Sequence, residues 1–303
     1  MPYGPPGRPT PPPRKRGGGG FTAVILVVIF LLVGGLVKYA VNTGFDIGVD
    51  AIGPKPTTTY DPQPGTAAAA TADNPLLTDA DGTLIPASCD YAPWGTQVDK
   101  ARAFFESAAT CLQAAWKPLL AQNNLPFEPP TLSVTATTDG ITTPCTGSTS
   151  NFAAFYCPAN KTIYMPISQL QTNQFRDNWV VYLSVFAHEY GHHVQAQSGI
   201  LRKANSERVE AGARSAKGLE LSRRVELQAN CFDGMFISSS QTAGSLSSSQ
   251  VTVATRDSYG RGDTAGDMRD HGTAEHGGQW FEAGLRNLTS LCNTFTAPAG
   301  EVS

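Results

Sequence analysis

The stretch over residues 179–193 reads Trp-Val-Val-Tyr-Leu-Ser-Val-Phe-Ala-His-Glu-Tyr-Gly-His-His and decides how the chain is interpreted. Its first part is apolar nearly all round, which is typical of a buried helix, and we expect a helix over residues 177–197. His188 and His192 are four residues apart, so both imidazoles lie on one helix face and can bind the same metal ion. Glu189 follows the first histidine and can take a proton from a metal-bound water. This His-Glu-x-x-His pattern predicts a zinc hydrolase.

A catalytic zinc site needs a third protein ligand. A histidine six residues after His192 serves in one class of zinc peptidase, but Ser198 stands at that position, which excludes the class. Glu226 lies in a segment whose apolar residues have helical spacing, and we expect a helix over residues 219–237. A carboxylate there is costly to bury unless it is paired or bound to metal, so we predict Glu226 as the third ligand. The competing interpretations are Glu220 or Asp233 as the ligand, and an exposed Glu226 paired with Arg223 or Arg224.

Two further histidines are candidates for a role near the metal. His193 is adjacent to His192 and faces about 100° away from it on a helix, so we expect a structural or surface group rather than a ligand. His271 stands in the polar stretch 269–272, which we expect to be a loop, and active-site residues are frequent on loops. There it can serve catalysis by stabilising the oxyanion of a tetrahedral intermediate. A plain surface histidine is the competing interpretation.

The N-terminal part of the chain predicts attachment to a membrane. Residues 1–20 are rich in Pro and Gly, carry basic residues and no acid, and should form a disordered tail. Residues 21–41 are apolar apart from Lys38 and are long enough for one transmembrane helix. A cleaved signal peptide has a similar pattern, but no small-residue cleavage site follows the apolar run closely. The basic flank predicts a cytoplasmic N-terminus, with the rest of the chain on the extracytoplasmic side of the cell membrane.

Composition divides the remainder of the chain. Residues 42–85 contain several prolines and runs of Thr and Ala without apolar periodicity, so we expect a flexible linker. We expect the folded domain over residues 86–296 and a short tail over 297–303. The chain after residue 20 carries 18 of the 22 basic residues and all 25 acidic ones. It has no Lys/Arg cluster of the kind a nucleic-acid surface needs, so we expect no nucleic-acid partner.

The chain has six cysteines, all beyond the predicted membrane segment. An even number of cysteines in an exported domain indicates three disulfides, for which about 15 pairings are possible. No Cys-x-x-Cys pair is present, so the cysteines do not indicate a metal site. The pairing that we expect is Cys89–Cys111, Cys145–Cys157 and Cys231–Cys292.

The predicted fold class is α+β, mostly helical with a small sheet. Apolar residues at helical spacing predict a helix over residues 97–120, and alternation predicts a strand over 131–137. Residues 161–167 form a second strand candidate, which Pro166 places towards the edge of the sheet. The serine-rich segment 238–249 is expected to be a loop or a connection between helices.

Several of these motifs together resemble the neutral zinc metallopeptidase family of bacterial envelope proteins. The resemblance covers roughly residues 85–296, with the motifs in the same order. It implies a zincin-like fold, zinc held by His188, His192 and Glu226, and Glu189 as the catalytic base. The segments that carry it are His188–Gln195, Glu226–Phe232, His271–Thr273, Trp280–Phe281, Cys292–Phe295, Tyr156–Ala159 and Ile163–Tyr164.

The chain departs from the family pattern at three places. Asn230 stands where the family usually has Asp; it can accept a hydrogen bond from a zinc-bound histidine but brings no charge. The loop over residues 276–279 replaces a Gln-Arg pair, and Met165-Pro166 replaces a segment that commonly contains an acid. These departures affect how the metal site is tuned and how substrate is held.

The sequence therefore predicts a membrane-anchored, extracytoplasmic zinc peptidase with a gluzincin-like ligand set and a peptide or protein substrate. A catalytically impaired binding or regulatory module of the same fold is the alternative, motivated by Asn230 and by residues 276–279. A purely structural envelope protein that uses its disulfides for rigidity is a third, weaker interpretation.

Overall fold

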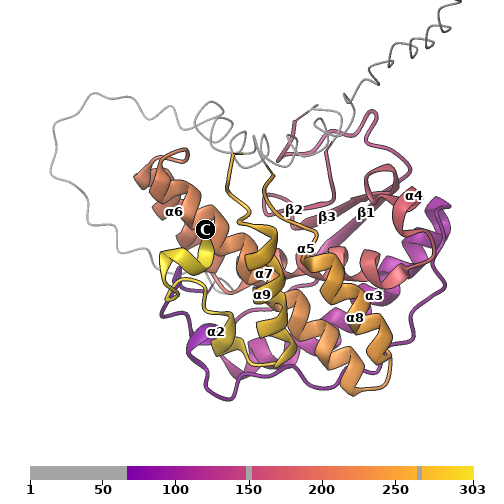
Figure 1. Cartoon of the computed structure of the whole chain (residues 1–303), viewed down its shortest axis with the longest axis horizontal. Helices are drawn as coiled ribbons and strands as arrows, with labels where there is room; N and C mark the ends of the chain where they lie inside the picture. The colour runs from indigo at the N-terminus through magenta and orange to yellow at the C-terminus, as the bar shows by residue number, and fades with distance from the viewer. Residues whose placement is uncertain (1–66, 148–151, 265–267) are drawn as a thin grey trace, which may run out of the picture.

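The computed structural model describes residues 67–147, 152–264 and 268–303 (Figure 1). The expected tail over 1–20, the expected membrane anchor over 21–41 and residues 42–66 of the expected linker lie outside the described residues. Among the helices of the described ranges, none is long and apolar enough to cross a membrane.

Two long helices form the centre of the fold, α5 (Trp179–Gln197) and α7 (Ala216–Thr242). α5 buries most of its residues, as its apolar sequence predicts, and the two helices pack against each other. Gly191 lies at their contact: a Cβ there would stand 3.2 Å from the carbonyl oxygen of Ala229 and 3.3 Å from its Cα. A glycine between the two motif histidines therefore lets the α7 backbone approach the histidine face of α5.

α7 is longer than expected, and the prediction of a loop from Ser238 was wrong for residues 238–242. Ser239 and Ser240 are fully buried. The hydroxyl of Ser239 donates to the carbonyl of Ile85 at 2.5 Å and accepts from the amide of Ala87 at 3.1 Å. The serines are buried because they hydrogen-bond a distant segment, a contact that helical periodicity does not reveal.

The sheet has three short strands in the order β1-β3-β2, namely β1 (Thr131–Thr135), β2 (Phe155–Cys157) and β3 (Thr162–Pro166). β1 is parallel to β3, and β2 is antiparallel to it. The prediction of an edge position for the second strand was wrong, because β3 is central. Pro166 is tolerated since it ends the strand, beyond the part of β3 that pairs with β2. β2 was not predicted; three residues are too few for a periodicity.

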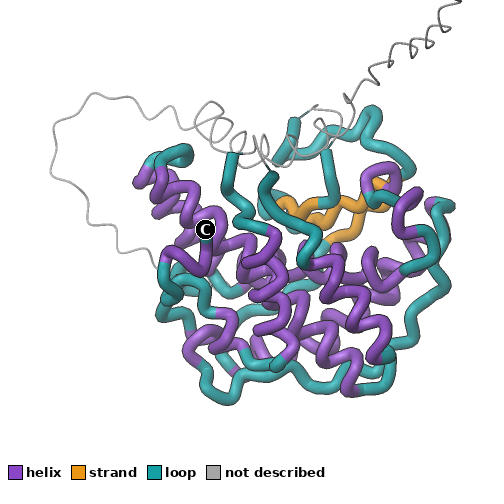
Figure 2. The backbone as a smooth tube through the Cα atoms, viewed as in Figure 1, coloured by secondary structure: helices purple, strands orange, loops and turns teal. Residues whose placement is uncertain are grey.

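The other helices surround this centre, and Figure 2 shows the strands gathered on one side of a mostly helical body. α3 (Val98–Gln122) packs on α5, and its Trp116 meets Phe232 of α7 edge-on with ring centroids 5.0 Å apart. The mostly helical α+β class predicted from the sequence agrees with this arrangement. The remaining elements are α2 (Pro75–Thr78), η1 (Ile167–Gln169), α4 (Thr172–Phe175), α6 (Ile200–Ala211), α8 (Ser248–Ser258), α9 (Ala274–Leu285), η2 (Thr289–Cys292) and η3 (Ala299–Val302).

Residues 276–279 lie in helix α9, so the prediction of a loop there was wrong. Thr273 caps the helix by accepting a hydrogen bond from the amide of His276 at 3.2 Å. The prediction failed because glycine, here Gly278, is usually an indication of a loop. Here it is required by packing, since a Cβ at Gly278 would stand 2.3 Å from the ring of Tyr259.

Both ends of the described chain pack against the domain, contrary to the expected linker and tail. In the segment 67–85, Leu76, Leu77 and Leu84 are buried, and the side-chain Nδ2 of Asn74 donates to the carbonyl of Ser198 at 2.8 Å. At the other end Val302 is fully buried. The apolar residues of these segments are too few to show a helical or strand period, which explains the error.

All three disulfides have the expected pairing, which is confirmed: Cys89–Cys111, Cys145–Cys157 and Cys231–Cys292. The described part of the chain contains no free cysteine. The third bridge ties η2 to α7, so a segment more than sixty residues away in sequence is held against the central helix.

A buried carboxyl group links α5, α7 and the end of α8. Asp233 of α7 is fully buried and accepts a hydrogen bond from the Ser184 hydroxyl at 2.5 Å. Its Oδ2 lies 4.0 Å from the guanidinium of Arg261, which is itself ion-paired with Asp257. Burial raises the pKa of Asp233 to about 8, with the charge of Arg261 opposing the rise. The group is therefore protonated in the folded protein below that pH.

Substituting Asp233→Asn should flatten the dependence of stability on pH. The pKa of Asp233 is about 8 in the folded protein against an ordinary value of 3.8, so between these values the folded state holds a proton that the unfolded chain releases. The stability of the native protein should therefore decline as the pH rises from about 4 to about 8. Urea unfolding at about pH 5 and about pH 8 should show a smaller decline in the variant. The exposed Asp81→Asn is the matched control, and equal declines in all three proteins would contradict the expectation.

Candidate metal centre

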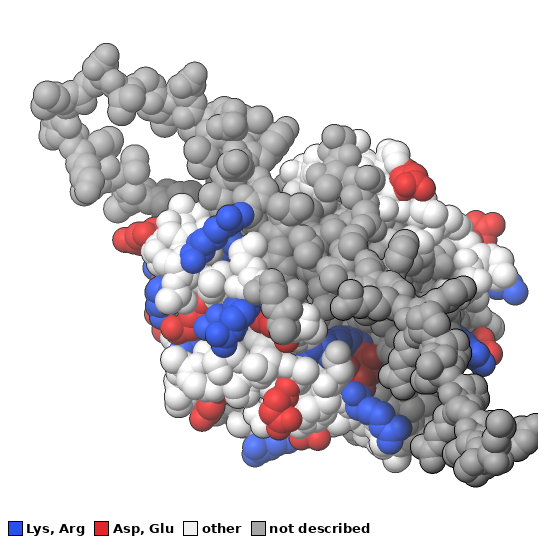
Figure 3. Space-filling view, turned by 45° about the horizontal axis from the view of Figure 1, so that its top comes forward, with Lys and Arg blue, Asp and Glu red and all other residues white. Residues whose placement is uncertain are grey.

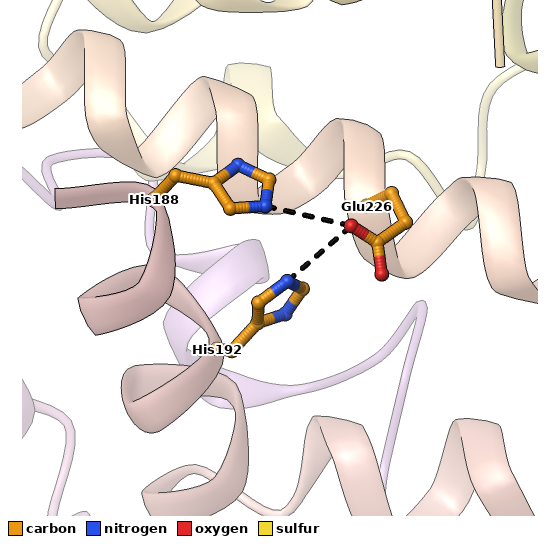
Figure 4. Close-up of side chains that lie close together, drawn as sticks. All are labelled: His188, His192 and Glu226. Atoms are coloured by element: carbon orange, nitrogen blue, oxygen red, sulfur yellow. Dashed lines mark ion pairs between the residues drawn. The ribbon is translucent and has the colours of Figure 1, made fainter. Parts of the chain in front are cut away.

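His188, His192 and Glu226 meet where α5 packs on α7 (Figure 4). The Nε2 atoms of His188 and His192 each lie 3.4 Å from the same carboxylate oxygen, Oε2 of Glu226. Two ligand atoms bound tetrahedrally to one zinc ion, each at about 2.05 Å, are about 3.3 Å apart. The separations of both histidines from Glu226 therefore fit those expected around a zinc ion, and all three ligand atoms lie within 4.8 Å of one another.

The other carboxylates considered for the third ligand have different partners. Glu220 is ion-paired with Arg224 and Lys217, and Asp233 accepts from Ser184. The two arginines beside Glu226 do not pair with it. Arg223 donates to the carbonyls of Val302 and Arg269, and Arg224 binds Glu220 and the carbonyls of Thr294 and Ala297.

A side-chain amide faces the second ring nitrogen of each imidazole. Nδ1 of His188 lies 2.8 Å from Oδ1 of Asn230, and Nδ1 of His192 lies 2.8 Å from Oε1 of Gln195. Histidine ligands of zinc usually donate this other N–H to an oxygen acceptor, which fixes the ring and its tautomer. Asn230 thus makes the hydrogen bond that its position in the sequence predicts, without a negative charge.

The direction of the hydrogen bond at His192 follows from its surroundings. The amide nitrogen of Gln195 donates to the carbonyl of Val225 at 2.8 Å and to Oε1 of Gln228 at 3.0 Å. Gln228 in turn donates to the carbonyl of Cys292 at 3.0 Å. Because both amide hydrogens of Gln195 are used, its oxygen must face His192 and accept from Nδ1–H. The lone pair of Nε2 then points at Glu226.

The two imidazole nitrogens and the carboxylate oxygen meet in a partly buried site, where a proton or a metal cation between them is favourable. Burial opposes ionisation of Glu226, but the charge of His192 and hydrogen bonds from both imidazoles hold its pKa well below the usual value. Burial lowers the pKa of His188 to about 4. For His192, burial is outweighed by the Glu226 charge, which raises the pKa to about 9. One positive charge thus belongs in this cluster, and its nitrogen and oxygen donors suit zinc.

Glu189, the predicted base, is held by the sheet. Its Oε2 accepts a hydrogen bond from the backbone amide of Tyr156 in β2 at 2.9 Å. Burial raises the pKa of Glu189 to about 7, although the charge of His192 opposes the rise. A carboxylate with a pKa near neutrality is suited to take and return a proton. Sequence reasoning did not find the role of Tyr156, because a backbone amide has no sequence signal of its own.

His193 is fully buried, as a structural group would be. Its Nδ1 lies 3.1 Å from the hydroxyl of Tyr156, and its Nε2 lies 2.6 Å from the carbonyl of Glu128. Both ring nitrogens are therefore occupied, and neither is left for a metal. Through Tyr156, His193 also supports the strand whose amide holds Glu189.

His271 lies between two carboxylates in the loop before α9. Its Nδ1 is 3.3 Å from Asp270 and 3.6 Å from Asp263. Burial would lower the pKa of His271, but hydrogen bonds to Asp263 and Asp270 raise it well above the usual value. The resulting cation is close enough to the metal cluster for its charge to act on Glu226 and Glu189. The structure thus places His271 near the three predicted ligands.

A mostly helical α+β domain that brings His188, His192 and Glu226 together has the arrangement expected of a zinc-dependent hydrolase. Residues 92–295 match the family described as "Putative neutral zinc metallopeptidase", and the chain belongs to that family, as its motifs predict. It is 32% identical over 167 residues to the uncharacterized protein YpfJ of Escherichia coli (strain K12), covering 50% of this chain and 58% of the relative.

Mycobacterial proteins are similar over a longer segment. The chain is 29% identical over 211 residues to the uncharacterized protein Rv2575 of Mycobacterium tuberculosis (strain H37Rv), which is 61% of this chain and 68% of that protein. The match to Mb2605 of Mycobacterium bovis has the same extent. The chain thus spans less than two thirds of the length of the Escherichia coli relative. No solved structure matches it significantly.

Substituting Gln195→Leu should weaken zinc binding roughly 10- to 100-fold, the usual effect of removing a hydrogen-bond partner of a histidine ligand. The substitution leaves Nδ1–H of His192 without its acceptor and frees the ring to turn. Competition with a chromogenic zinc chelator measures the affinity. The exposed Gln279→Leu is the matched control, and equal affinities for the two variants would contradict the role of Gln195.

Proposed function

We propose that the protein is a single-pass, membrane-anchored peptidase that hydrolyses peptide bonds outside the cytoplasmic membrane with zinc bound by His188, His192 and Glu226. The observation that carries the proposal is the 3.4 Å separation of both Nε2 atoms from one carboxylate oxygen. The anchor rests on the apolar stretch 21–41. The extracytoplasmic location is supported by three disulfides, because such bonds persist in oxidising compartments.

The hydrolysis that we propose uses Glu189 as the base. Zinc supplies Lewis acidity when bound, polarising the scissile carbonyl and lowering the pKa of water towards about 7. Glu189 takes a proton from the attacking water and returns it to the leaving amine. The amide of Tyr156 binds only one of the two carboxylate oxygens, Oε2, and this leaves Oε1 to meet the water. The pKa of about 7 lets Glu189 do both steps near neutral pH.

We assign His271 to the oxyanion that forms when water adds to the carbonyl. The two carboxylates beside it hold the imidazole positively charged, and the charge acts on the metal cluster. A fixed cation next to a developing negative charge lowers the barrier to hydrolysis. The substrate in this proposal is a peptide or protein. Where described residues are visible in Figure 3, acidic and basic side chains are interspersed.

A catalytically impaired binding or regulatory module is the second candidate. Asn230 favours it, because a neutral amide at 2.8 Å from His188 makes that ligand less basic than a carboxylate partner would. Weaker electron donation by His188 would alter the electrophilicity of the zinc ion and the affinity of the site for zinc. The proposed peptidase and the binding module therefore differ in turnover rather than in zinc content.

Purified full-length protein should contain about one zinc ion per chain, and Glu189→Gln should retain it while hydrolysis falls by at least about 100-fold. The change removes the base and leaves all three ligands in place. Metal analysis and a peptide-library cleavage screen measure the two properties. His188→Ala is the control that should lose both.

Two outcomes would decide against the proposal. A native protein without zinc would refute the metal assignment and with it the peptidase. Zinc without cleavage, unchanged after Asn230→Asp, would instead support the binding module.

A further inference from the structure

Arg208, in the last turn of α6, is a buried arginine without a partner among the residues that the structure describes. Its residue is only 5% exposed, and it makes no hydrogen bond and no ion pair within the described ranges. Its Nε atom is buried and unpartnered. Every other buried Asp, Glu or Arg of the described chain has at least one partner, although Oδ1 of Asp233 and Oδ1 of Asp270 also lack a hydrogen bond. The partners are the Tyr156 amide for Glu189, Glu220 for Arg224, Ser184 for Asp233 and His271 for Asp270.

The position of Arg208 relates it to the metal centre. α6 follows α5 and packs along α7, the helix that supplies Glu226 (Figure 1). The carboxylates whose charges act on Arg208 are those of Asp270 and Glu226. Both lie beyond direct contact, since neither forms an ion pair with the guanidinium within 4.0 Å. Arg208 therefore lies on a helix packed against α7, within range of the Glu226 charge, and its donors have no partner among the described residues.

The chemistry of guanidinium restricts what these donors can bind. Arginine stays protonated, so it cannot relieve the cost of burial by releasing a proton, as lysine or aspartate can. Its planar N–H groups match a carboxylate or a phosphate in a two-bond fork. A phosphate dianion usually needs several cations, whereas the charges that act on Arg208 are those of two carboxylates, Asp270 and Glu226. A single carboxylate fits one fork in these surroundings.

We propose that Arg208 binds a carboxylate of the peptide substrate beside the proposed metal centre. The inference rests on the proposed function for the nature of the substrate and adds a determinant of specificity. Two sources supply the same group, the C-terminal α-carboxylate of a peptide and the side chain of an acidic residue.

The test measures binding to the zinc-loaded, full-length Glu189→Gln variant, which does not need turnover. The probes are acetylated alanine peptides with a free C-terminal carboxylate or a carboxamide, each containing one glutamate or one glutamine. The carboxylate form should bind at least about tenfold more tightly than its amide partner, as expected for a hydrogen bond to a charged group. A preference between the two C-termini identifies the α-carboxylate as the bound group, and a preference between glutamate and glutamine identifies the acidic side chain. Hydrolysis by the wild type does not enter this readout, so its absence leaves the test intact.

Substituting Arg208→Met in that background should abolish the preference, and Arg208→Lys should keep part of it, because the charge stays and the fork is lost. Arg214→Met, which changes an exposed arginine just beyond α6, is the matched control and should keep it in full. Carboxylate and amide peptides that bind equally, or a preference that survives Arg208→Met, would overturn the proposal, as would no binding of any probe.

Thermal unfolding separates this role from a structural one. Arg208→Met should leave the melting temperature unchanged or raise it, because it removes a buried charge without a partner. Arg224→Met, which breaks a paired buried arginine, should lower it. A similar loss of stability in both variants, with all probes weakened together, would assign Arg208 to the structure and refute the proposal.

Discussion

The close contact of α5 and α7 at Gly191 is the constraint on which the centre of this protein depends. It brings two imidazole nitrogens and one carboxylate oxygen together in a partly buried site. A positive charge between these atoms offsets the cost of bringing them together. The contact between α5 and α7 is what places the three side chains close enough to share such a charge.

The polar groups behind the histidines connect this cluster to the rest of the fold. A series of hydrogen bonds runs from His192 through the side-chain amides of Gln195 and Gln228 to the carbonyl of Cys292. Cys292 is bonded covalently to Cys231, the neighbour of Asn230 in α7. The disulfide thus holds the carbonyl of Cys292, the last acceptor in this series, against the helix that carries Glu226. Its position indicates that it stabilises the orientation of His192, a predicted zinc ligand, as well as the folded state.

Sequence reasoning succeeded where the relevant information is local. The spacing of His188 and His192 is a property of one helix, and the helical position of Glu226 among apolar residues shows that a carboxylate there needs a partner. It failed where contacts are distant or segments short. β2, the buried serines of α7 and the packed segment 67–85 gain their structure from remote partners. The roles of Gln195 and Gln228 are missed for the same reason, although Gln195 lies within the motif that resembles the family.

Two buried ionisable side chains, Asp233 and Arg208, show how the structure distinguishes a stabilising role from a binding role. Asp233 can avoid its buried charge by binding a proton, and the Ser184 hydroxyl and the nearby Arg261 surround it on the protein side. Arg208 has neither option, since guanidinium does not deprotonate and no described residue pairs with it. A group that destabilises the free protein persists when something outside the chain completes its environment. If the neighbouring cluster holds zinc as we propose, the most direct complement for Arg208 is an anionic group of the substrate.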